Sequence, residues 1–161
     1  MNNKLILSVI LVLSLLLAGC TAQKSESINF YYRAAQLNFG PEDSIVKPET
    51  RKEYFNHLAY NEIISCYLEG PTSTNLHTPF PEGTSLVSIS TEQETASIVL
   101  SNPFSQLTGI DLTIACSCLS LTIGEITGCS KVQISAQNAL LDNKQSITIN
   151  INELSFTDLV A

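Results

Sequence analysis

The amino-terminal segment of this chain is a short apolar run that ends at a cysteine. Lys4 gives the start a positive charge, residues 5–17 are apolar apart from two serines, and Ala18-Gly19-Cys20 follow. A membrane-spanning helix needs about 20 apolar residues, so this run has the length of a secretory signal. We therefore expect residues 1–19 to be an export signal, and the fold to be built from the rest.

The end of the apolar run, Leu17-Ala18-Gly19-Cys20, resembles the lipobox of bacterial lipoproteins. This resemblance implies a lipoprotein signal peptide, cleavage before Cys20, and lipid on the Cys20 sulfur, with acyl chains such as palmitate. An ordinary secretory signal and an uncleaved anchor are the alternatives. Residues 20–27 would form a tether of at most about 25 Å. We expect the domain to lie at the extracytoplasmic face of the bacterial membrane, bound to it through two acyl chains.

Charge and length limit the class of protein. The formal net charge is −7, and removal of Lys4 with the signal makes it one unit more negative. The chain has no basic cluster that could neutralise phosphates, so we expect no nucleic-acid partner. The part after the signal is long enough for one domain with a sizeable core.

The first half of the mature chain predicts two strands and a helix. Apolar and polar residues alternate over residues 28–33, and a second strand is expected at 44–51, where Pro48 favours a sheet edge. Apolar residues recur at helical spacing within 53–68, and Gly70 followed by a proline is a typical helix end.

The second half predicts four more strands and a second helix. The strands are expected at residues 86–91, 96–101, 131–135 and 145–152. The first two are expected to form a hairpin, after a loop at 71–83. The tail, 153–161, is left as a last sheet edge or a loose end.

The second helix is expected over residues 109–123, with Thr108 and Asp111 near its start. It carries two apolar stripes on different sides. One stripe consists of Leu112, Ala115, Leu119 and Ile123, and the other of Ile114, Cys118 and Leu121. A helix that is apolar on most sides is usually buried, so we favour a core helix over an exposed binding face.

The resulting element order, ββαββαββ, predicts an α+β fold. We expect two helices packed on one face of a small, mostly antiparallel or mixed sheet.

Six segments together carry a family resemblance. They are residues 28–32 (INFYY), 46–51 (VKPETR), 68–71 (LEGP), 81–89 (PEGTSLVSI), 100–104 (LSNPF) and 121–132. In this order and spacing they resemble the GerM-like domain of sporulation and spore germination, placed here at 28–152. The chain departs from the family at 136–139, where an Asp-Gly turn is usual. The resemblance implies a non-catalytic assembly or binding role, in proteins that occur as lipoproteins and look like ring-building modules.

Cysteines are the first residues to consider for chemistry. Cys20 leaves Cys66, Cys116, Cys118 and Cys129. Cys116 and Cys118 lie about 200° apart around a helix and cannot bond each other. We favour free, buried thiols, with one disulfide or a cysteine-rich metal site as alternatives. No metal or other cofactor is expected.

Candidates for catalysis are few. The histidines, His57 and His77, have no marked nucleophile near them in the sequence. The carboxylates that a glycosidase would need are scattered and are explained by surface solubility; they are Glu49, Glu53, Glu82 and Asp111. We therefore expect no enzyme.

Candidates for ligand binding are also few. Tyr31 is the one aromatic residue of residues 30–32 expected to point off the core face. Thr148, Asn150 and Asn152 form the polar side of the last strand, and a solvated sheet face explains them more simply than a binding ledge.

Three functions follow from the sequence. The preferred one is a membrane-anchored interaction or assembly domain, in sporulation, germination or envelope assembly, whose partner is another protein or a second copy. The alternative is a lipoprotein that binds a small ligand or a glycan such as peptidoglycan. An envelope hydrolase is third.

Overall fold

A computed structural model describes residues 27–36, 44–52 and 58–154. The elements are, in order, β1 (Ile28–Ala34), β2 (Val46–Arg51), α2 (Tyr60–Leu68), β3 (Leu76–His77), β4 (Leu86–Glu92), β5 (Thr95–Leu100), η3 (Asn102–Gln106), α3 (Gly109–Thr127), β6 (Lys131–Ala136), β7 (Ile147–Asn150) and η4 (Ile151–Glu153). Here η denotes a 3-10 helix. The fold is α+β, as the sequence predicts.

The strands form two sheets. The smaller one has the order β2-β1-β3 and is antiparallel. The larger one has the order β4-β5-β6-β7, in which β5 and β6 run parallel and the outer pairs antiparallel. The sequence analysis expected one mixed sheet, whereas the strands are divided between two.

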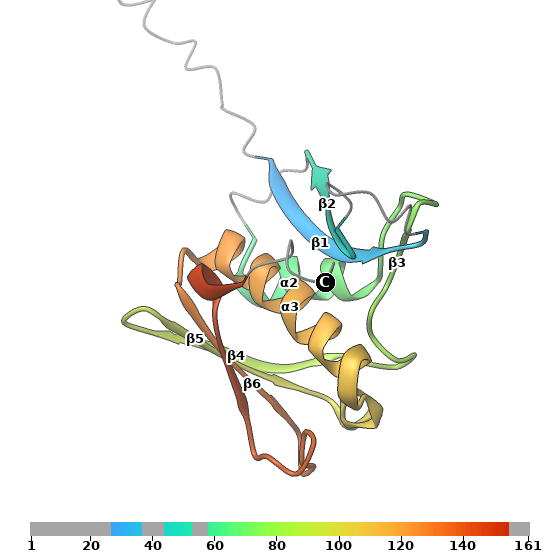
Figure 1. Ribbon diagram of the computed structural model, residues 1–161. Coiled ribbons are helices and arrows are strands. Elements are labelled where there is room, and N and C mark those ends of the chain that lie inside the picture. The colour runs from blue at the N-terminus through green and yellow to red at the C-terminus, as the bar shows by residue number, and fades with distance from the viewer. Residues whose placement is uncertain (1–26, 37–43, 53–57, 155–161) are drawn as a thin grey trace, which may run out of the picture.

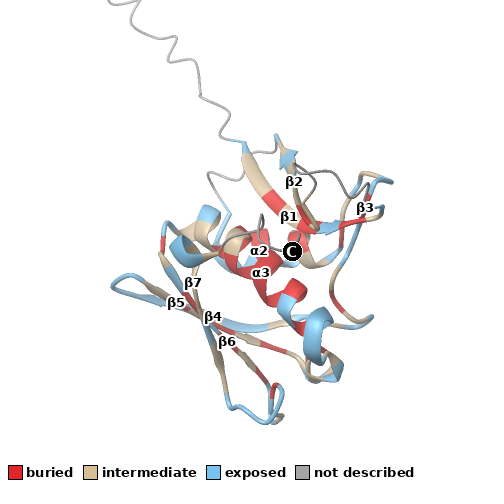
Figure 2. Ribbon diagram, viewed as in Figure 1, coloured by how far each residue is buried: buried red, intermediate tan, exposed pale blue. Residues whose placement is uncertain are grey.

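Both helices lie between the two sheets, with α3 in the middle of the molecule (Figure 1). The two apolar stripes of α3 explain this position. The stripe that contains Leu112 and Leu119 joins the main core with the larger sheet, and the stripe that contains Ile114 and Cys118 packs with Val46 of β2. The expected core role of this helix is confirmed, and Figure 2 shows its buried residues in the centre of the fold.

Within the described part of the chain, α3 is the one helix long and apolar enough to cross a bilayer, judged by length and composition. Of its most apolar window, 56% is buried inside the protein. Because sheets cover it on two sides, its hydrophobicity is accounted for by the core.

Tyrosine hydroxyls join β1 to α2. The Tyr32 hydroxyl donates to the Tyr67 carbonyl oxygen at 2.9 Å, and the Tyr67 hydroxyl donates to the Tyr31 carbonyl oxygen at 2.8 Å. The Tyr67 ring also packs against Phe30 and Phe80, with ring centroids 5.4 Å apart in both pairs. A buried tyrosine hydroxyl needs a hydrogen-bond partner, and here each hydroxyl donates to a backbone carbonyl oxygen of the facing element.

The helix ends differ from the predicted bounds. The helix expected over 53–68 begins only at Tyr60, because Ala59 is extended and its N–H donates to the Glu62 carboxylate at 2.8 Å; residues 53–57 lie outside the described residues. Gly70, at φ 102°, follows its end as expected. The second helix continues past residue 123 to Thr127, until Gly128 adopts a left-handed conformation.

The strand bounds also differ in places. β2 is an edge strand, as Pro48 predicts, and it starts at Val46 rather than residue 44. The loop expected at 71–83 contains the two-residue strand β3, which pairs with the end of β1. The strand expected over 145–152 is shortened to β7, because Ile151 turns into η4 and its N–H donates to the Ser130 carbonyl at 2.9 Å.

Candidate functional site

Part of the predicted site lies outside the described residues. Cys20, with the signal and most of the tether, falls in 1–26, and His57 and Glu53 fall in 53–57. The lipid attachment at Cys20 therefore stays a prediction of the sequence.

The four other cysteines carry free thiols. Cys66 is half-buried and the other three are buried. Burial raises the pKa of Cys116 and of Cys118 to about 12, so neither forms a thiolate near neutral pH. Their place in the two cores of α3 identifies them as packing residues, as the sequence favours.

Glu49 accepts more hydrogen bonds than any other carboxylate of the described residues. The expectation that it is one of several scattered surface groups is therefore wrong. Its side chain is only 10% exposed. The backbone N–H groups of Thr72 and Ser73 donate to it at 3.0 and 2.9 Å, and the Thr72 hydroxyl donates as well. Arg51 pairs with it at 3.1 Å. Burial alone would raise the pKa of Glu49, but these hydrogen bonds together lower it.

Arg51 completes this cluster. Its Nη2 donates to the Gly70 carbonyl oxygen at 2.7 Å, and its guanidinium lies 5.3 Å from the centroid of the Phe30 ring. The side chain is 12% exposed. The cluster thus connects β2 to the segment that follows α2. Because the carboxylate is occupied by donors from several directions, it is suited to holding the fold rather than to acid–base catalysis.

Among the described residues, the remaining candidate catalytic groups form no hydrogen bond or ion pair with one another. His77 is exposed on β3, Glu82 is exposed in a turn, and Asp111 pairs with Arg33 at 3.0 Å on the surface. The described residues contain no group of three or more histidine, cysteine or acidic side chains that could hold a metal ion. At the start of α3, Asp111 forms its ion pair with a residue of β1. Thr108 occupies the N-cap position, but its side chain makes no capping hydrogen bond.

The two candidate ligand-binding features belong to different sheets. Tyr31 points away from the core face of Phe30 and Tyr32 as expected, and its side chain packs partly buried beside Ile114 and Cys118 of α3. Asn150 is on β7, and its amide oxygen accepts a hydrogen bond from the Asn152 N–H. Because α3 lies between the sheets, Tyr31 and the polar side of β7 do not line a common cleft.

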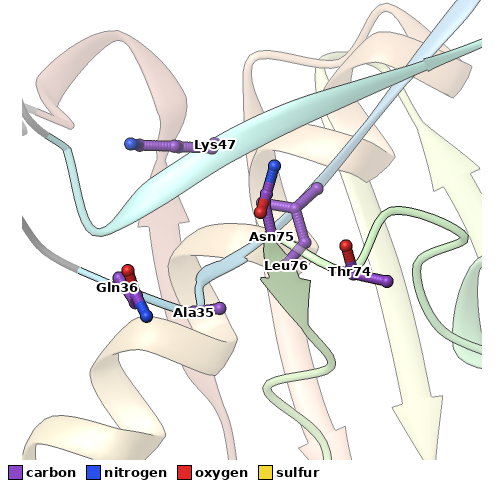
Figure 3. A pocket seen from close by; sticks show the side chains of 6 residues that line it. All are labelled: Ala35, Gln36, Lys47, Thr74, Asn75 and Leu76. Atoms are coloured by element: carbon purple, nitrogen blue, oxygen red, sulfur yellow. The ribbon is translucent and has the colours of Figure 1, made fainter.

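A pocket of about 460 Å³, with a mixed polar and apolar lining, lies at one end of the smaller sheet. Figure 3 shows the six side chains that line it, which come from the two residues after β1, from β2, from the two residues before β3 and from the start of β3. They are Ala35, Gln36, Lys47, Thr74, Asn75 and Leu76. The lining contains one charged side chain and no acid–base pair, so the pocket has no catalytic set of its own.

Two shallow grooves lie at the two edges of the larger sheet. The groove at β4, of about 550 Å³, includes Tyr60 and Val87. The groove at β7, of about 200 Å³, includes Leu112, Ile147 and Ile149. The sequence analysis missed these surfaces, although consecutive apolar residues at 86–87 interrupt the alternation of that strand and mark one side chain as facing outward.

Comparisons with known proteins agree with this fold. A family model described as Germane, sporulation and spore germination, matches residues 29–142, which is more than half of the chain. The solved structure of the tandem GerMN domains of the sporulation protein GerM from Bacillus subtilis is 18% identical, with a TM-score of 0.54, over 75% of this chain and 42% of that one. This chain thus spans less than half of the tandem-domain structure.

The structure of the first GerMN domain of the same protein alone is 14% identical, with a TM-score of 0.53, over 74% of this chain and 91% of that one. At these identities the likeness shows a shared fold. No curated protein matches the chain in sequence.

Proposed function

Because the chain belongs to the Germane family of sporulation and spore germination, we propose that it is a membrane-anchored interaction or assembly domain. In this proposal it acts on the extracytoplasmic face of a bacterial membrane, in sporulation, germination or envelope assembly. Its partner is another protein or a second copy of the chain. It has no catalytic activity and needs no cofactor.

The observation that carries the proposal is the distribution of polar and apolar groups. The buried titratable side chains of the described residues are engaged in packing or in the Glu49–Arg51 cluster. The exposed large hydrophobic side chains instead lie beside the grooves at the edges of the larger sheet. Exposed apolar groups next to open strands suit protein contacts, whereas reaction chemistry needs convergent polar groups.

Lipid on Cys20 supplies the anchor in this proposal. The tether of residues 20–27 reaches at most about 25 Å, and it leads directly into β1, the middle strand of the smaller sheet. The domain would therefore work close to the membrane surface, where its partners should also be found.

A glycan such as peptidoglycan is a second candidate partner. The outer face of the larger sheet presents a cross-strand row of Ser90, Ser97, Gln133 and Thr148. The Ser97 hydroxyl donates to Gln133 at 3.4 Å, and the Gln133 amide donates to Ser146 at 3.1 Å. Polar rows of this kind can contact sugar hydroxyls, although solvation explains them as well.

The anchor is tested by mass spectrometry of the full chain purified from membranes. We expect the mature chain to begin with a diacylated Cys20. In the Cys20→Ala variant, we expect the chain to be uncleaved or to lack the lipid. An unmodified Cys20 with Met1 still attached would refute the anchor.

The interaction role is tested by in situ crosslinking of the native chain, followed by incubation of the purified protein with peptidoglycan fragments. Crosslinked protein partners or multimers support the proposal. Specific retention of peptidoglycan without any protein partner would instead favour the second candidate. Hydrolysis of peptidoglycan in a zymogram would contradict both.

A further inference from the structure

Exposed large hydrophobic side chains collect at the two opposite edges of the larger sheet. Near β4 they are Val87, Tyr60 and Leu58, with exposed fractions of 44%, 42% and 39%. Near β7 they are Ile110 and Leu140, with exposed fractions of 60% and 53%. Ile110 comes directly after Gly109, which lines the β7 groove, and Leu140 lies in the connection between β6 and β7. These five are the exposed large hydrophobics of the described residues, and none lies on the smaller sheet.

The edges of the two sheets differ in the same way. The edge strand of the smaller sheet, β2, carries Lys47, Pro48 and Arg51, which are residues that block further strand pairing. Its other edge, β3, has only two residues. In contrast, β4 is uncharged from Leu86 to Thr91, and β7 is uncharged throughout. Among the described strands, only those of the larger sheet therefore form edges open to another strand.

The side-chain rows of the larger sheet extend to both edges. One inner row runs Ile89, Ile98, Ile134 and Ile147 from β4 to β7, and the first and last of these are only partly buried. An outer row runs Ser90, Ser97, Gln133 and Thr148. If the sheet were continued by another β4 beside β7, an isoleucine would meet an isoleucine on the inner face, and a hydroxyl would meet a hydroxyl on the outer face.

Strand direction fits an assembly in which all copies have the same orientation. β4 is antiparallel to β5, β5 is parallel to β6, and β6 is antiparallel to β7. β4 and β7 therefore run in the same direction. Joining β7 of one copy to β4 of the next leaves both copies pointing the same way, as anchors in one membrane require. Because the two edges are different surfaces, the contact is head-to-tail and can be repeated.

We propose that this chain assembles with further copies of itself through its larger sheet, with β7 of one copy paired in parallel with Ile89–Glu92 of β4 in the next. Val87 lies at the bulge in β4, between the paired residues Leu86 and Ser88. It packs, with Tyr60, against the β7 groove of the neighbour, where Ile147 and Ile149 lie beside Asp142 and Lys144. This inference rests on the proposed function, because it names the partner of the interaction domain.

A single edge-to-edge contact of this size is weak in dilute solution. Strands of this length bury much less area than a standard stable interface. Anchoring in one membrane raises the effective concentration of the edges, and contacts on both sides of each copy add to this. The assembly should therefore form on membranes and dissociate in dilute detergent.

The test uses the full chain in bacterial membranes with cysteines placed on the outer row. Ser90→Cys and Thr148→Cys are made separately and together, and the membranes are treated with a short bis-maleimide reagent. We expect co-expressed single variants to give crosslinked dimers and the double variant to give a ladder of multimers. The unaltered chain gives the background from its native cysteines. Gln133→Cys, on a central strand, co-expressed with Ser90→Cys, is the matched control and should give only background.

A second substitution, added to the cysteine variants, tests the apolar contact at Val87 itself. In the crosslinking background, Val87→Lys should lower the crosslinked fraction about tenfold, because it places a charge against apolar side chains. Val87→Thr, of similar shape, should lower it much less. Circular dichroism establishes that both variants fold.

Several results would overturn this inference. Dimers from Ser90→Cys alone would indicate a symmetric contact, and capture of a different protein at β4 would replace the second copy. Background levels in every combination would exclude the contact altogether. In each of these cases the proposed function would still hold if Cys20 carries lipid and a protein partner binds at another surface. Absence of both lipid and any partner would remove that function as well.

Discussion

Replacing Glu49 with glutamine should destabilise the fold strongly although the shape of the side chain is kept. The change removes the negative charge that pairs with Arg51 and that receives the N–H groups of Thr72 and Ser73. Removal of one member of a buried ion pair costs about 3–5 kcal/mol. Because the loop around Thr72 is accessible to water and the glutamine oxygen still accepts one bond, we expect about 2–3 kcal/mol for Glu49→Gln.

The assay is urea unfolding followed by circular dichroism, on the chain from residue 20 with Cys20→Ser. A loss of this size lowers the melting temperature by roughly 10 °C in a domain of this length. Glu82→Gln is the control, since Glu82 is exposed in a turn, and it should change stability by less than about 0.5 kcal/mol.

The pH dependence has a definite sign. The folded state lowers the pKa of Glu49 below its ordinary value of 4.5. The stabilisation by its carboxylate is therefore complete above that value and is lost as the pH falls through the folded pKa. The stability difference between the native chain and Glu49→Gln should be constant near neutral pH and should narrow in acid. A difference below about 0.5 kcal/mol at neutral pH, or one that does not narrow in acid, would refute the role assigned to this cluster.

Three further results are expected. Tyr67→Phe removes the hydroxyl that donates to the Tyr31 carbonyl, and should lower the free energy of unfolding by about 1–2 kcal/mol in urea titrations. Gly124→Ala places a methyl group against the Cδ1 atom of Ile151, and should destabilise by about 1–2 kcal/mol in thermal melts. Cys116, whose pKa burial raises to about 12, should resist alkylation until urea unfolds the chain, as measured by mass spectrometry.

Each of these has its own control. Tyr60→Phe, at an exposed ring, should be neutral, and equal losses at both tyrosines would contradict the hydrogen-bond argument. Ile151→Val removes Cδ1 and should restore most of the stability of Gly124→Ala; no recovery would show that the close approach is not the cause. Cys66, which is half-buried, should be alkylated in the folded chain, so a faster reaction of Cys116 would mean that the core is open.

The sequence predicts those elements whose local signals agree with their surroundings. Alternation located β1 and the β4–β5 hairpin, and Gly70 marked the end of α2. The two stripes of α3 were visible because a helix with two apolar sides must be covered on both. Two apolar stripes also imply that a separate layer covers each side of this helix. This inference would have predicted two sheets instead of one.

The missed features depend on long-range contacts. β3 is two residues long and exists through its pairing with β1, so it has no alternation to detect. The parallel pairing of β5 with β6 follows from the long α3 connection, which is the usual link between parallel strands, and the predicted order contained this signal. The sequence around Glu49 does not show that it is buried, because its donors Thr72 and Ser73 are more than 20 residues away in the chain. The edge surfaces were hidden for the same reason, since strand order decides which strands are outermost.

Helix α3 packs against both sheets of the domain, and this affects how the domain can unfold. Neither sheet can leave without uncovering one side of this helix, and the loss of either would expose one of its apolar stripes to water. The two halves should therefore melt together in one cooperative transition rather than as separate units. A mechanical load applied at the start of β1 would reach α3 directly, because β1 packs on this helix, so the whole domain should resist such a load as a single body.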